Sequence, residues 1–111
     1  MYKRIFLLTC FITSFSVYSA ENDFDKMCGY FKELDNTLVI NKLNQTQREA
    51  FINQRVIKNL KVNSPARQTW EVVIYAVPEE RYDMVQSTAV ELLKTSWRCD
   101  AMMKYISTVG K

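Results

Sequence analysis

The 111-residue sequence contains no histidine, and it has only two glycines, two prolines and three cysteines. Without histidine, the chain lacks the usual general base, the usual proton relay and the commonest zinc ligand of enzymes. Two glycines are too few for a loop that cradles phosphates, and the cysteines form no Cys-x-x-Cys motif. We therefore expect a protein that is not an enzyme, with no catalytic residues, no metal and no cofactor.

The N-terminal segment has the pattern of a bacterial secretion signal. A short positive start at Lys3 and Arg4 precedes an apolar run over residues 5–15. Small residues follow, and cleavage is expected after Ser19, with cleavage after Ala20 as the alternative. The pattern predicts export to the periplasm.

The domain boundaries follow from that segment: a signal peptide over residues 1–19 and a single domain over residues 20–111. Two other interpretations of the segment stay open. A membrane anchor would need roughly 20 apolar residues, more than this run supplies. Lipid attachment at Cys10 would follow Thr9, which is larger than the residue usually found before a lipid-modified cysteine.

Removing the leader changes both the charge and the cysteine count. Thirteen basic residues then face twelve acidic ones, so the net charge falls from +3 to +1. A nearly neutral domain has no electrostatic basis for binding nucleic acid, and no membrane association is expected after cleavage. The remaining pair, Cys28 and Cys99, predicts one disulfide, with two buried free thiols as the alternative. Closing a loop of roughly 70 residues stabilises a domain by about 4 kcal/mol.

Apolar residues recur at helical spacing along the domain, and no useful stretch alternates with period two. The first predicted helix spans about 22–35, with an apolar stripe of Phe24, Met27, Cys28, Phe31 and Leu34. The second spans about 46–61, because Thr46 and Glu49 match a capping box. Its apolar residues are Ala50, Phe51, Ile52, Val56, Ile57 and Leu60.

Ser64 and Pro65 predict the start of a third helix, a hydroxyl cap followed by proline at the first position. Pro78 ends this helix and starts the next. The third helix has the stripe Ala66, Trp70, Val73, Ile74 and Val77. The fourth has the stripe Tyr82, Val85, Ala89, Leu92, Leu93 and Trp97. Beyond Trp97, the helix either continues or breaks near Cys99. The fold class is an all-α bundle of four to five helices tied by one disulfide, Cys28–Cys99.

Two groups of residues have the composition of a reactive site, but their context favours a structural role. Glu79 and Asp83 share a helix face, but beside Arg81 they are typical of a solvated helix start rather than of an acid–base pair. Cys99 lies between Arg98 and Asp100, yet a cysteine in a disulfide is not a nucleophile. Both Trp70 and Trp97 are expected in the core.

One surface stands out as a candidate for protein contact. Tyr75 is off the main stripe of its helix and precedes a charged corner, which combines an exposed aromatic with arginine as protein interfaces often do. The candidate partner-contact residues are Tyr75, Glu79, Glu80, Arg81 and Tyr82. The expected partner is a protein, and a homodimer stays open.

The second half of the chain resembles the type VI secretion amidase immunity proteins. Residues 70–78, Trp-Glu-Val-Val-Ile-Tyr-Ala-Val-Pro, form an amphipathic segment that ends at a proline, and residues 87–99 end in Trp97-Arg98-Cys99. Cys28-Gly29-Tyr30 is similar to the family's N-terminal motif, with Asp35 closer than usual. Members often carry further cysteines that this chain lacks.

The resemblance implies a periplasmic protein that binds a peptidoglycan amidase delivered by neighbouring cells and blocks its active site. Occlusion requires only a complementary surface, which fits a chain without histidine. The alternative is a periplasmic assembly or chaperone-like helper, such as a pilotin-type factor of a secretion or pilus system, which holds a partner segment in a helical groove.

Overall fold

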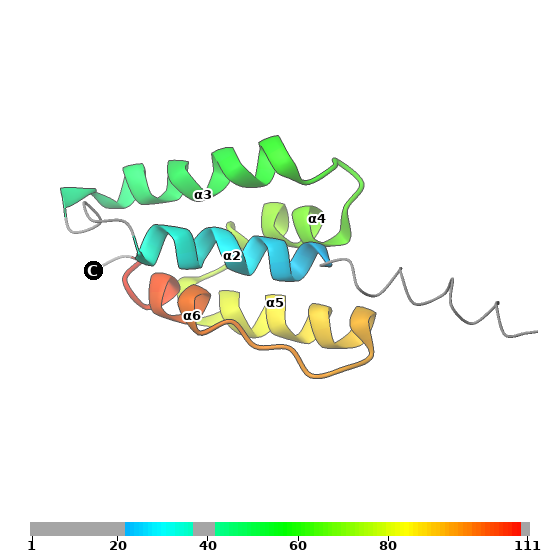
Figure 1. The fold of residues 1–111 in the computed structure, drawn as a ribbon. Helices are drawn as coiled ribbons and strands as arrows, with labels where there is room; N and C mark the ends of the chain where they lie inside the picture. The colour runs from blue at the N-terminus through cyan, green and yellow to red at the C-terminus, as the bar shows by residue number, and fades with distance from the viewer. Residues whose placement is uncertain (1–21, 37–41, 110–111) are drawn as a thin grey trace, which may run out of the picture.

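The computed structural model describes residues 22–36 and 42–109, and the expected signal peptide lies outside them. These residues form helices and no strand, which confirms the all-α prediction (Figure 1). The five helices are α2 (Asp23–Asp35), α3 (Gln45–Asn59), α4 (Pro65–Val73), α5 (Pro78–Leu93) and α6 (Asp100–Ser107).

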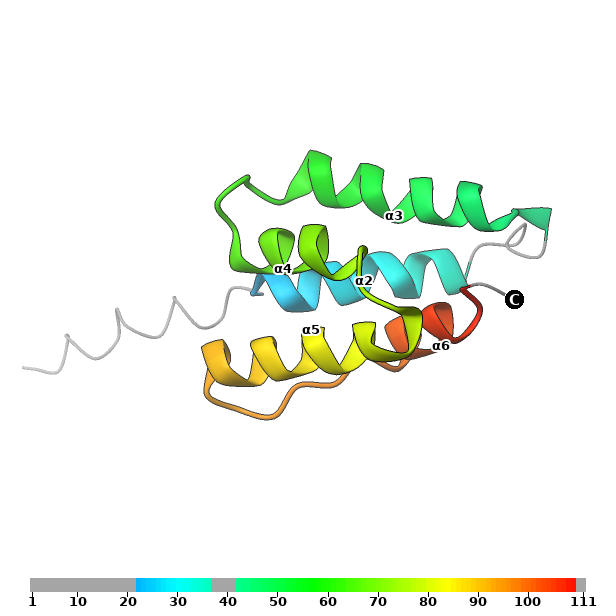
Figure 2. The same ribbon diagram turned by 180° about the vertical axis from the view of Figure 1, so that it is seen from behind.

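Helix α2 lies at the centre of the bundle. It packs against α3, α4 and α6, while α5 packs against α4 and α6. Figures 1 and 2 show α2 between α3 on one side and the α5–α6 pair on the other. The bounds predicted for this helix are confirmed, and so is its stripe: Phe24, Met27, Cys28, Phe31 and Leu34 are all buried.

Helix α3 begins earlier than predicted. Its cap is Asn44, whose side chain accepts a 2.8 Å hydrogen bond from the backbone N–H of Gln47. The Gln47 side chain accepts in return from the backbone N–H of Asn44 at 2.9 Å. The cap predicted at Thr46 is wrong because asparagine is the stronger cap and Asn44 has its own partner three residues on. Ile57, expected on the stripe, is 59% exposed.

Helix α4 starts as predicted but ends sooner. Ser64 caps it and Pro65 follows. The Ser64 hydroxyl also donates to Asp23 at 2.7 Å, which ties the start of α4 to the start of α2. The helix ends at Val73, and Val77 is extended and 53% exposed rather than part of the stripe. Helical geometry is disfavoured in the residue before a proline, which accounts for the extended backbone of Val77.

Helix α5 ends at Leu93, so the fourth predicted helix breaks before Cys99 and does not continue to the C-terminus. Lys94 adopts a left-handed conformation with φ of 60°, and this conformation terminates helices. Residues 95–99 lie outside any helix, and α6 begins after the cap residue Cys99. Trp97 therefore lies between the two helices rather than on a helical stripe, although it is buried as expected.

The core is held by a disulfide and by aromatic pairs. Cys28 and Cys99 are bonded as predicted, with their Cα atoms 5.8 Å apart and a sequence separation of 71. Phe31 packs edge-on against Trp70 at 5.4 Å between ring centroids. Trp97 packs against Phe24 at 6.0 Å and against Tyr82 at 6.4 Å. Both tryptophans are thus core residues, as expected.

Candidate protein-docking surface

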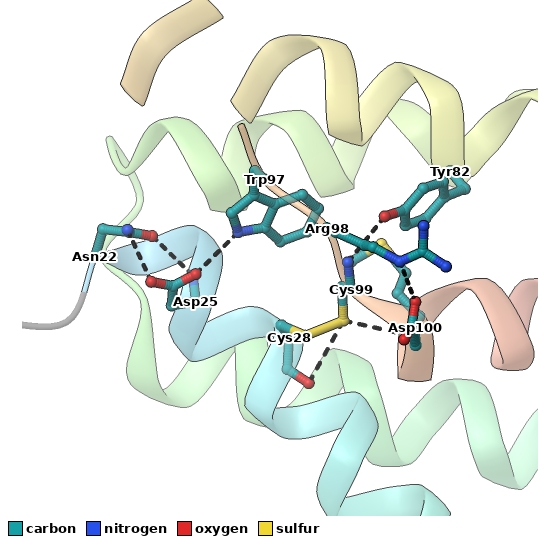
Figure 3. Close-up of a disulfide and its surroundings, with 9 residues drawn as sticks. Asn22, Asp25, Cys28, Tyr82, Trp97, Arg98, Cys99 and Asp100 are labelled. Carbon is teal, nitrogen blue, oxygen red and sulfur yellow. Dashed lines mark hydrogen bonds and ion pairs between the residues drawn. A yellow bond between two sulfur atoms is a disulfide. The ribbon is translucent and has the colours of Figure 1, made fainter. Parts of the chain in front are cut away.

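The disulfide lies at the meeting point of α2, α5 and the segment that leads into α6. Figure 3 shows Tyr82 and Trp97 on either side of Cys99. The Tyr82 hydroxyl accepts a 2.8 Å hydrogen bond from the backbone N–H of Cys99. Because both sulfur-bearing residues are buried, this bond lies in a low-dielectric region where an unpaired N–H would be costly. It fixes α5 relative to the disulfide.

A network of side-chain hydrogen bonds holds the segment before Cys99 against α2. The indole N–H of Trp97 donates to the carboxylate of Asp25 at 2.9 Å (Figure 3). The side-chain amide of Asn22 donates to the Asp25 carboxylate at 2.9 Å, and the side-chain oxygen of Asn22 accepts from the backbone N–H of Asp25 at 2.8 Å. On the other side, Gln86 donates to the Trp97 carbonyl at 2.9 Å. The non-helical segment is thereby anchored to both α2 and α5.

Three of the five predicted contact residues are exposed. Tyr75 projects from the turn after α4 and is 86% exposed, as its position off the stripe predicted. Glu79 and Glu80 are also exposed, in the first turn of α5. Arg81 is half-buried, and its Nε donates to the carbonyl of Ala76 at 2.9 Å. Arg81 thus holds the turn that presents Tyr75.

The structure corrects the placement of Tyr82. Its side chain is only 9% exposed, and its hydroxyl is engaged by Cys99. Tyr82 belongs both to the charged corner, which predicted exposure, and to the apolar stripe of α5, which predicted burial. Tyr82 is buried beside Trp97, so it stabilises the fold and is not an exposed contact residue.

Sequence patterns missed an apolar surface that surrounds α4. We call it the α4 face, and it consists of exposed side chains from three helices and the turn after α4: Ile57, Val72, Tyr75, Met84 and Leu92. Ile57 and Leu92 were predicted to be buried because they continue helical stripes. Val72 and Tyr75 are three residues apart, and this spacing was the one local signal for a second apolar side of α4.

A shallow groove lies on each side of α4. The groove toward α3, with a volume of about 290 Å³, is lined by Ile57, Trp70 and Tyr75 among others. The groove toward α5, with a volume of about 360 Å³, is lined by Val72, Met84 and Leu92 among others. The α4 face therefore consists of two grooves, one on each side of α4, with Tyr75 lining the first and Val72 lining the second.

A third groove lies between α5 and α6, with a volume of about 400 Å³. Its apolar side is formed by Met103, Ile106 and Val109, and its α5 side includes Glu79 and Asp83. We call it the α5–α6 groove. It lies on the side of α5 away from α4, and Pro78, next to the exposed Val77, is one of its lining residues.

Two ionisable groups have shifted pKa values for clear physical reasons. The side-chain hydrogen bonds from Arg55 hold the pKa of Glu33 below its ordinary value. The Arg55 guanidinium meets this carboxylate at 2.9 and 3.0 Å and lies 3.4 Å from the centre of the Phe51 ring. Burial raises the pKa of Tyr105 to about 12, with a smaller contribution from the charge of Glu49.

In the part of the chain that the structure describes, no three histidine, cysteine or acidic side chains gather closely enough to hold a metal. None of the helices in that part is long and apolar enough to cross a membrane. The chain matches no protein-family model, no curated protein and no solved structure.

Proposed function

We propose that this chain is an exported, periplasmic and non-enzymatic binding protein, which covers the active site of a protein partner as type VI secretion amidase immunity proteins do. The observation that carries the proposal is the α4 face, on which Tyr75 is 86% exposed. Its expected target is a peptidoglycan amidase effector.

The α4 face has the composition of a docking surface. Ile57, Val72 and Leu92 are each more than half exposed, and Ile57 lines the same groove as Tyr75. Scattered single apolar residues are normal on a protein surface, whereas a continuous apolar patch favours a partner. Tyrosine is among the residues that contribute most to binding when an interface buries them.

The face is built on a rigid support. The backbone N–H of Tyr75 bonds to the carbonyl of Val72 at 3.1 Å, and Arg81 holds the carbonyl of Ala76. Because few groups would have to be ordered on binding, little entropy would be lost. A preformed surface is what an inhibitor needs when it acts by occlusion rather than by chemistry.

The disulfide supports the proposed location. Cys28 and Cys99 are bonded and buried. Such bonds persist in oxidising compartments, among them the bacterial periplasm, and are rare in the cytosol. The N-terminal pattern of the sequence points the same way.

The test is an inhibition assay with purified type VI amidase effectors, first of all one encoded beside this chain. Release of cleaved peptides from peptidoglycan is measured with increasing amounts of the full chain, purified under non-reducing conditions. We expect stoichiometric inhibition of one effector. The double variant Tyr75→Ala and Val72→Ser should weaken inhibition by about tenfold or more, which corresponds to about 1.4 kcal/mol.

The matched control is Val62→Ser, which makes the same change at a valine that is 70% exposed and lines none of the three grooves. It should inhibit like the unaltered chain. If no effector binds or is inhibited, the immunity function is wrong. If inhibition survives the double variant, the α4 face is not the docking surface.

One observation favours the second candidate, a pilotin-type helper. The groove between α4 and α5 is lined by Val72, Met84 and Leu92 and could hold an apolar segment of a partner. A helper of this kind would bind an isolated apolar peptide and leave amidases active. The two candidates therefore give opposite results in the inhibition assay.

A further inference from the structure

We infer that the α5–α6 groove receives a basic side chain, preferably arginine, from an apolar stretch of the partner protein. The inference rests on the proposed function, because it states the chemistry of the partner's surface. It arises from the combination, in one groove, of apolar walls and two carboxylates that form no ion pair with any residue the structure describes.

The apolar part of the groove would accept a hydrocarbon stem. Met103, Ile106 and Val109 line one side, and the ring of Tyr82 borders the groove from α5. The volume of about 400 Å³ leaves room for a long side chain together with part of its neighbour. Arginine and lysine bury their methylene stems along such surfaces while the charged head reaches a polar site.

The acidic part of the groove would accept the charged head. Glu79 and Asp83 line the α5 side and are four residues apart, so they share one face of the helix. Like charges at this spacing repel each other, and among the described residues neither carboxylate has an ion pair. A guanidinium placed between them would relieve the repulsion and could donate to both.

The N-terminus of α5 stabilises the negative charge of only one of these two acids. Glu79 lies in the first turn of α5, where the helix dipole stabilises negative charge. Asp83 lies beyond the first turn, where that effect has fallen away. The helix dipole therefore does not neutralise the Asp83 carboxylate, which lies exposed at the edge of the groove.

No base of the described residues takes this place. Arg81, on the same helix, donates to the carbonyl of Ala76. Lys104, on α6, pairs with Asp35 at 2.8 Å and lines a different depression. Among the described residues the groove is lined by two acids and no base, which is the complement of a cationic apolar partner.

The groove is also firmly supported. Tyr82, which borders it, is held by the backbone N–H of Cys99 at 2.8 Å, one residue from α6. Both walls are thus tied to the disulfide. A basic residue entering the groove would meet groups already in position, which lowers the entropy lost on binding.

The test is a titration of the full chain, isotope-labelled and purified under non-reducing conditions, followed by NMR. The probe is the peptide acetyl-Leu-Arg-Leu-amide, and its matched control is acetyl-Leu-Gln-Leu-amide. We expect the arginine peptide to shift the backbone signals of Met103 and Ile106, to bind about fivefold more tightly than the control, and to weaken as salt is added.

The variant arm uses Glu79→Gln with Asp83→Asn, and its control is Glu91→Gln at an exposed acid near the other end of α5. We expect the double variant to lose the preference for arginine and the control to keep it. Equal binding of the two peptides, no binding of either, or an unchanged preference in the double variant would overturn the inference.

The same variants separate this inference from the proposed function. If an amidase is inhibited equally by the chain with and without the two acids, the function stands and the inference fails. If the groove prefers arginine but no amidase is inhibited, the inference stands and the immunity function fails.

Discussion

The hydroxyl oxygen of Tyr82 accepts a 2.8 Å hydrogen bond from the backbone N–H of Cys99, so a side chain of α5 holds the residue that closes the disulfide. Tyr82→Phe keeps the ring but leaves a buried N–H unpaired. We expect the free energy of unfolding to fall by about 1–3 kcal/mol, measured by urea denaturation followed by circular dichroism.

The control for this change is Tyr75→Phe, which removes a hydroxyl from a side chain that is 86% exposed. Its effect should stay within about 0.5 kcal/mol. If both variants were equally stable, the hydrogen bond to Cys99 would contribute nothing measurable.

The disulfide should contribute a large share of the net stability. Cys28 and Cys99 have a sequence separation of 71, and releasing a loop of this length from its constraint costs about 4 kcal/mol. We expect the double variant Cys28→Ala and Cys99→Ala to lose about that amount in denaturant unfolding. Mass spectrometry of the unaltered chain without reductant should find no alkylatable thiol at either position, and two free thiols would contradict the structure.

The start of α3 can be tested by exchanging its two candidate caps. Asn44 makes reciprocal hydrogen bonds with Gln47, whereas Thr46 lies inside the helix and is exposed. Asn44→Ala should destabilise the protein by about 1 kcal/mol, and Thr46→Ala should cost much less. The measurement is thermal unfolding of the two variants side by side. A larger loss for the threonine variant would move the helix start to the position predicted from sequence.

Stability should decline at high pH because of Tyr105. Burial raises the pKa of Tyr105 to about 12 from an ordinary value of 10.0. Between these values the unfolded chain has lost the phenolic proton while the folded chain keeps it, so stability present below pH 10 is lost as the pH rises toward 12.

The measurement is the urea midpoint between pH 9 and pH 12, with Tyr105→Phe as the test variant. The phenylalanine has no proton to lose, so its midpoint should fall less steeply over this interval. Tyr75→Phe, at an exposed tyrosine, serves as the matched control and should follow the unaltered chain. Parallel curves for all three proteins would remove Tyr105 as the cause.

Much of the helical core could be predicted from local periodicity. The stripe of α2 and the cap and proline that start α4 are signals within a few residues, and both are confirmed. The break at Lys94 could not be predicted in the same way. Leu93 and Trp97 continue the helical spacing, and neither glycine nor proline lies between residues 94 and 99. Trp97 is buried by Phe24 and Tyr82, which are distant in sequence.

The candidate surface was only partly predictable for a related reason. Tyr75 was identified because it is off the stripe of its own helix, which is local information. Whether Val72 or Leu92 is exposed depends on where the neighbouring helices end and how they pack, which no single helix encodes. Tyr82 satisfied both a surface motif and a core spacing, and only its tertiary partner Cys99 decides between them.

The bond between Cys28 and Cys99 closes residues 28–99 into a covalent ring. A protease that cuts once within the ring, for example in the exposed stretch 61–63, produces two pieces that remain joined. Two cuts are needed to release a fragment from the ring, whereas one cut after Cys99 detaches α6. A single nick along α3, α4 or α5 therefore leaves the covalent connection intact, whereas α6 lies outside the ring and has no such protection.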